Sequence, residues 1–181
     1  MYMYYMAIVL PEELNKEVLS YKQYMLDKYN CKVGLKSPAH LTIIPPYWMQ
    51  REKEQSLLNQ LDEICLRVER FPIATKNFSA FKPRTIFIDV DVDEKLKHFK
   101  KRVDHFFLDH QDYGAKVDTR PFHPHITIAT RDLYKKSFAE AWAYFESKEF
   151  ATAFTGTGLS TLRHNGRSWD ILHLSRFQNA D

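Results

Sequence analysis

Short runs of apolar and β-branched residues alternate along the chain with longer stretches in which apolar side chains recur at helical spacing. The short runs predict strands, and the longer stretches predict amphipathic helices. Strands are expected at residues 4–10, 39–44, 71–81, 84–92 and 125–130, with further strands within residues 150–177. The apolar faces of four helices are expected within residues 14–25, 57–68, 96–107 and 138–145.

Turn and cap residues mark the ends of several of these elements. Pro45-Pro46 is expected to stop the second strand, because proline cannot donate to the hydrogen bonds of a sheet. Asp93 is expected to cap the third helix, and Pro11 to begin the first. Asn165-Gly166 is typical of a hairpin turn near the end of the chain.

The order of these elements occurs twice. The tetrapeptide His40-Leu41-Thr42-Ile43 returns as His125-Ile126-Thr127-Ile128, at an offset of 85 residues. Two more pairs repeat at offsets of 82 and 83 residues, Leu14 with Leu96 and Arg84 with Arg167. Because landmarks of different kinds agree, we expect residues 1–181 to form a single domain of two similar lobes, offset by about 83 residues.

Composition narrows the possible classes of protein. A hydrophobic content of 44% over 181 residues is enough for a core and excludes wholesale disorder. A net charge of +3 permits an anionic substrate without demanding a nucleic-acid coat. The chain has no apolar run long enough to span a membrane, its first residues do not resemble a signal peptide, and its two cysteines are expected to be reduced. We therefore expect a cytoplasmic protein without membrane contact.

The repeated His-x-Thr motifs carry the candidate chemistry. Because strand side chains alternate between faces, His40 and Thr42 share one face, as do His125 and Thr127. If the lobes are related by a rough two-fold axis, both faces can converge on one cleft. One imidazole could then accept a proton and the other donate one during phosphodiester cleavage. The threonine hydroxyls could hold the phosphate oxygens, and this scheme needs no metal or cofactor.

Five other residues are candidates for substrate contact. Arg131 shares a face with the second motif if that strand continues, although a solvated arginine at a strand end fits equally well. Arg84 could approach the cleft from the other lobe, and an exposed loop arginine is the alternative. Phe81 could stack on a nucleobase, as could Tyr47 or Trp48, and packing is the alternative for each. The basic side chains of the third helix, Lys100 among them, are expected to form a solvated face, with attraction of RNA as the alternative.

The two motifs and their contexts, SPAHLTIIPP and RPFHPHITIATR, resemble those of the 2H phosphoesterases, in particular the 2′-5′ RNA ligase-like (LigT) branch. The resemblance implies an α+β fold of two lobes, with antiparallel sheets, outer helices and a central cleft. It also implies metal-independent action on 2′,3′-cyclic phosphates or 2′-5′ linkages of RNA or nucleotides. The catalytic histidines would be His40 and His125, and the phosphate-binding hydroxyls Thr42 and Thr127. Arg131 departs from the pattern, since relatives often have the arginine one residue earlier.

Two other functions compete with this hypothesis. A binding module could hold RNA ends or cyclic nucleotides without turnover, although a pure binder needs no proton shuttle. A metal hydrolase could use His123 and His125, and it would lose activity on chelation. The sequence identifies neither the natural substrate, the direction of the reaction, the acidic histidine nor the oligomeric state, and it predicts no protein partner.

Overall fold

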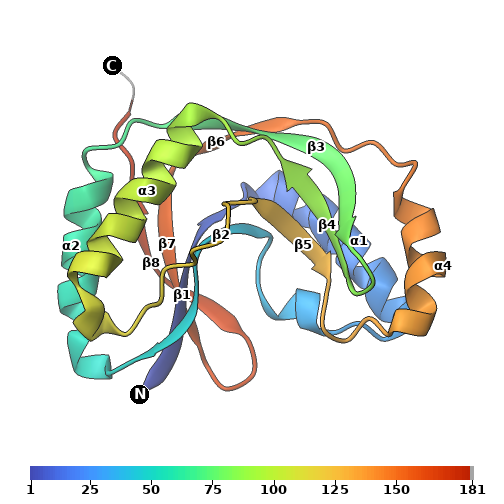
Figure 1. Ribbon diagram of the computed structural model, residues 1–181, viewed down its shortest axis with the longest axis horizontal. Helices are drawn as coiled ribbons and strands as arrows, with labels where there is room; N and C mark the ends of the chain where they lie inside the picture. The colour runs from blue at the N-terminus through green and yellow to red at the C-terminus, as the bar shows by residue number, and fades with distance from the viewer. Residues whose placement is uncertain (180–181) are drawn as a thin grey trace.

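The computed structural model describes residues 1–179. Within them the chain forms two four-stranded antiparallel sheets, with α-helices on the outside (Figure 1). The strands are β1 (Tyr2–Val9), β2 (His40–Met49), β3 (Phe71–Phe81), β4 (Thr85–Val90), β5 (His125–Ala129), β6 (Ala153–Gly156), β7 (Gly158–His164) and β8 (Trp169–Arg176). The helices are α1 (Glu12–Tyr29), α2 (Glu54–Cys65), α3 (Glu94–Asp109) and α4 (Lys135–Phe145), with short 3₁₀ turns η1 (Val33–Lys36), η2 (Arg51–Lys53) and η3 (Gln111–Tyr113). This is the predicted α+β fold of antiparallel sheets with outer helices.

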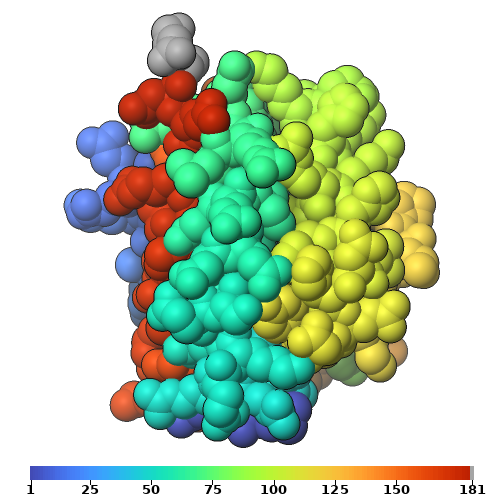
Figure 2. Space-filling model, turned by 90° about the vertical axis from the view of Figure 1, so that its left-hand side faces the viewer, coloured from blue at the N-terminus to red at the C-terminus, as the bar shows by residue number. Residues whose placement is uncertain are grey.

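The first sheet has the order β2-β1-β7-β8, and the second has the order β5-β4-β3-β6. The helices α2 and α3 pack on the first sheet and lie side by side on one face of the molecule (Figure 2). The helix α1 contacts β5, and α4 contacts β3. The two sheets meet where β2 lies against β5, in the middle of the molecule (Figure 1).

Along β1 and β4, alternate side chains lie on opposite faces of the sheet. Tyr4, Met6 and Ile8 of β1 join the main apolar core under the helices, whereas Tyr5 points to the opposite face. In β4, Ile86 and Ile88 likewise join the main core. The faces opposite the main core carry the candidate site.

The two sheets share one pattern of pairing. The strand β1 lies between β2 and β7, and β4 lies between β5 and β3. Each sheet thus combines strands from both halves of the sequence, since β3 belongs to the first half and β7 to the second. That the halves arose by duplication stays a prediction.

Two turn signals are confirmed, and the proline stop is wrong. Asp93 caps α3 by accepting a hydrogen bond from the Leu96 N–H at 2.8 Å, and Gly166, with a φ of +97°, lies in the turn between β7 and β8. Pro45-Pro46, however, does not end β2, which continues to Met49. The strand tolerates both prolines because it lies at the edge of its sheet, where its register with β1 is also irregular.

The prediction of a wholly solvated basic face on α3 is also wrong at one position. Lys100 is buried, pairs with Asp104 one turn further on, and lies 5.6 Å from the centre of the Phe122 ring. The loop that carries Phe122 covers this part of the helix, which the helix sequence alone does not indicate. None of the helices in residues 1–179 is both long and apolar enough to cross a membrane.

Candidate active site

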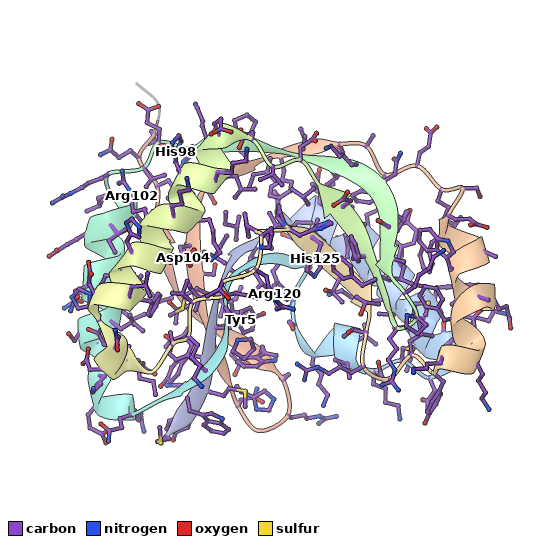
Figure 3. The ribbon with its side chains drawn as sticks, viewed as in Figure 1. Tyr5, His98, Arg102, Asp104, Arg120 and His125 are labelled. Atoms are coloured by element: carbon purple, nitrogen blue, oxygen red, sulfur yellow. The ribbon has the colours of Figure 1, made fainter. Side chains whose placement is uncertain are left out.

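Two cavities meet at Thr42 and Pro46 of β2, between the lobes. The larger, about 550 Å³, is called the His40 cavity here and is lined by Tyr5, Lys22, Lys36, His40, Thr42, Thr127, Arg131 and Trp169, among others. The other, about 510 Å³, is called the His125 cavity and is lined by Thr42, Phe81, Lys100, Asp104, Asp118, Arg120, Phe122, His123 and His125, among others. In Figure 3 Tyr5, Arg120 and His125 lie in the middle of the molecule, while His98 and Arg102 lie on α3.

His40 begins β2 and is fixed on two sides. Its Nδ1 lies 2.7 Å from the Pro38 carbonyl oxygen, which can only accept, so Nδ1 carries the proton and donates it. The ring of Tyr5 packs against the imidazole, with ring centres 5.0 Å apart. Burial, helped by the nearby charges of Lys22 and His125, lowers the pKa of His40 to about 4. This imidazole is therefore neutral at pH 7, with Nε2 as the proton acceptor.

His125 begins β5 in the same way. Its Nδ1 donates to the His123 carbonyl oxygen at 2.8 Å, again a carbonyl two residues earlier in the chain. The ring of Phe87 lies 4.9 Å from the imidazole, and the ring of Phe81 lies 5.2 Å from it. Phe87 lies opposite Thr127 in the register of β4 with β5, whereas Tyr5 lies two residues before Ala7, the partner of Thr42. Each motif thus holds its histidine by one carbonyl and one aromatic ring from the neighbouring strand.

The electrostatic surroundings of the two imidazoles differ. Burial also lowers the pKa of His125. The hydrogen bond to the His123 carbonyl opposes this, the charge of the His123 ring adds to it, and the carboxylate of Asp89 opposes it more weakly. Asp89 accepts a hydrogen bond from His123 Nε2 at 2.9 Å, so His123 links a carboxylate to the backbone that orients His125. Lys22, a cation, acts on His40 instead. The environment therefore favours the protonated form at His125 more than at His40.

The two threonines lie opposite the aromatic-bearing strands. Thr42 pairs with Ala7 of β1, and Thr127 pairs with Phe87 of β4. Both side chains are half-buried on the wall of the His40 cavity, and Thr42 also reaches the His125 cavity. Both hydroxyl-bearing side chains therefore lie at a cavity wall.

Some of the other predicted substrate contacts line a cavity, and others do not. Arg131 is exposed on the wall of the His40 cavity, and Phe81 lines the His125 cavity with 43% of its surface exposed. Arg84 lies in the turn between β3 and β4, where its N–H donates to the Phe81 carbonyl, and it lines neither cavity. Tyr47 is buried in the core, and Trp48 is exposed away from both cavities.

Lys22 and Tyr5 line the His40 cavity but are absent from the candidates that sequence analysis identified. Lys22 had a detectable signal, because it lies four residues after Val18 and three before Met25, on the buried face of α1. Tyr5 had none beyond its place in an apolar strand. Among residues 1–179, no group of three or more His, Cys, Asp or Glu side chains is arranged to hold a metal ion.

The bilobal fold and a family match together place this protein in the 2H phosphoesterase class. The model of the 2′-5′ RNA ligase superfamily matches residues 10–168, and the chain belongs to this family. Two curated relatives are each named "Putative phosphoesterase": one from Geobacillus sp. (strain WCH70), 29% identical over 58% of this chain, and one from Oceanobacillus iheyensis, 27% identical over 62%. The matches span 58% and 64% of those relatives' own lengths.

Solved structures share the fold over almost the whole chain. TT0787 of Thermus thermophilus superposes with a TM-score of 0.71 at 16% identity, covering 100% of both chains. E. coli LigT complexed with 3′-AMP gives a TM-score of 0.67 at 16% identity, covering 98% of each chain. LigT has also been crystallised with phosphate, ATP and NADP⁺.

Proposed function

We propose that this protein is a metal-independent phosphoesterase that acts on 2′,3′-cyclic phosphate or 2′-5′ phosphodiester bonds of RNA or nucleotides. One observation carries the proposal: two histidines, each held through Nδ1 by a carbonyl two residues earlier, line cavities that meet at Thr42. Both rings keep Nε2 available for proton transfer to a phosphate bound there. The nucleotide complexes of LigT support the substrate class.

In the proposed hydrolysis His40 is the general base and His125 the general acid. Nε2 of His40 accepts a proton from water while the water oxygen attacks phosphorus. Nε2 of His125 donates its proton to the ribose oxygen as the P–O bond breaks. The assignment rests on the surroundings of each ring, because Lys22 disfavours a proton on His40, whereas Asp89 favours one on His125. Ligation follows the same path with a ribose hydroxyl in place of water, and the reverse of that step cleaves a 2′-5′ bond and closes the cyclic phosphate.

The remaining groups bind the substrate in this proposal. The hydroxyls of Thr42 and Thr127 donate to the non-bridging phosphate oxygens, where negative charge grows during the reaction. Arg131 adds positive charge at the rim of the His40 cavity, and the exposed ring of Phe81 stacks on a nucleobase. Arg84 has no role, because it lines neither cavity.

The test is turnover of 2′,3′-cyclic AMP in the presence of EDTA. We expect wild-type turnover to be insensitive to EDTA, and His40→Ala or His125→Ala to lower kcat by about 10²- to 10⁴-fold. His105→Ala is the matched control, since His105 is exposed on α3 and should leave the rate unchanged. Turnover that survives the double substitution His40→Ala/His125→Ala would overturn the proposal. Nucleotide binding by the wild type without turnover would replace the enzyme with a binding module.

A further inference from the structure

We infer that the His40 cavity is a subsite for a second phosphate of the substrate, separate from the phosphate that reacts. The inference rests on the proposed function, which puts the reacting phosphate at Thr42, where the two cavities meet. The preferred substrate would then be a nucleotide with two phosphate groups, of which only one undergoes chemistry.

The first observation is a difference in charge between the cavities. The His40 cavity is lined by three cations, Lys22, Lys36 and Arg131. None of its lining residues in the described part of the chain is acidic. Each lysine and arginine of the His125 cavity is instead paired with a carboxylate on the same wall, Lys100 with Asp104 and Arg120 with Asp118. The His40 cavity therefore carries uncompensated lysine and arginine charge, and the His125 cavity does not.

The second observation is the state of Lys22. Its side chain is only 4% exposed, and its ammonium group donates one hydrogen bond, to the Ser37 carbonyl oxygen at 3.1 Å. An ammonium group has three N–H donors, and a buried charge without a counter-ion is costly. No carboxylate in residues 1–179 forms an ion pair with it. The acidic side chain of the neighbouring loop, Asp132, binds the backbone N–H groups of Lys32 and Val33 and does not line the cavity.

The third observation is an unused donor next to the same space. The Tyr5 hydroxyl is buried, in a residue that is 3% exposed, and it makes no hydrogen bond of good geometry within residues 1–179, although the Ser37 side chain lies near it. Lys36 and Arg131 are exposed at the cavity rim, where they can attract an anion. Buried donors inside and cations at the mouth together fit a phosphate group that enters from solvent.

The size and lining of the cavities set the orientation of the substrate. A cavity of about 550 Å³ is within the range that holds a whole small-molecule ligand, so it is larger than one phosphate needs. The His125 cavity, with Phe81 and Phe122 on its wall and its ions paired, fits an uncharged nucleoside. The substrate would therefore lie with its nucleoside beside His125 and its second phosphate beside Lys22.

The test compares the binding of adenosine 3′-monophosphate and adenosine 3′,5′-bisphosphate to the full chain by calorimetry at low salt. We expect the bisphosphate to bind about tenfold more tightly or better, as one added charged hydrogen bond typically gives. Lys22→Met should abolish this preference, and Lys22→Arg should retain part of it. Lys28→Met, which removes an exposed charge from the same helix, should leave the preference unchanged.

Equal affinities of the wild type for the two nucleotides would overturn the inference. A Lys22→Met variant whose affinity falls by the same factor for both nucleotides would also overturn it, because Lys22 would then serve the reacting phosphate. If Lys22→Met fails to fold, the double variant Lys36→Met/Arg131→Met replaces it and should reduce the same preference. Turnover of 2′,3′-cyclic AMP separates the two proposals: turnover without a bisphosphate preference removes the subsite alone, and the preference without turnover removes the enzyme alone.

Discussion

Acid should weaken the folded protein through His40. In the folded state the pKa of this ring is about 4, against an ordinary value of 6.5, because the ring is buried. Between these two pH values the unfolded chain binds a proton at His40 that the folded protein does not bind. Unfolding is therefore favoured as the pH falls from 6.5 towards 4, and the full stability is present above 6.5.

The size of the effect follows from the pKa difference. One pKa unit corresponds to about 1.4 kcal/mol, so a depression from 6.5 to about 4 limits the loss to about 3 kcal/mol. At pH 4.5 most of this loss has occurred, and we expect it to be about 2.5 kcal/mol. That is a large share of the roughly 5–15 kcal/mol by which domains are stable.

The assay is urea unfolding at pH 7 and pH 4.5 for the wild type and His40→Asn. The asparagine retains a donor for the Pro38 carbonyl but has no titrating ring. The wild type should lose about 2.5 kcal/mol more than this variant on acidification, whereas His105→Asn should lose as much as the wild type. If the wild type and His40→Asn lose the same free energy of unfolding, His40 titrates normally and the argument from burial fails.

Two further predictions concern catalysis and folding. For cyclic-phosphate hydrolysis, kcat/KM should rise with pH as His40 loses its proton at about pH 4. It should fall again before pH 6.5 is reached, because the pKa of His125 is lowered and the ring loses its own proton there. A plateau of kcat/KM that extends to pH 8 would contradict these roles. Asp93→Ala should lower the free energy of unfolding by about 1 kcal/mol in urea, because α3 loses its N-cap, and an unchanged midpoint would refute this.

Local patterns in the sequence predicted most of the elements, because strand and helix periodicity and caps such as Asp93 act over a few residues. The error at Pro45-Pro46 has a non-local cause. Whether a strand tolerates proline depends on whether it lies at a sheet edge, and that depends on the position of β1 and β7. Lys100 is a similar case, since Phe122, more than twenty residues later, covers it.

The site residues that belong to the repeated His-x-Thr motif were predictable from the sequence, and those outside the repeat were not. His40 and His125 stand out because the same motif occurs twice in matching contexts. Tyr5 looks like any other core residue of an apolar strand, and its contact with the His40 ring spans the irregular part of the β1–β2 register. The uncompensated charge of the His40 cavity is a property of several elements together, so no single segment of sequence reveals it.

The exchange of strands between the sheets constrains how the chain can fold during synthesis. The strand β1 ends at Val9, but its partner β7 begins only at Gly158, about 150 residues later. At roughly 5–20 residues per second the ribosome needs about 10–30 s to supply that partner. Throughout this interval the inner edge of β1, with its apolar side chains, has no neighbour, and an exposed apolar edge favours aggregation. The nascent chain is therefore most vulnerable just before its last two strands emerge.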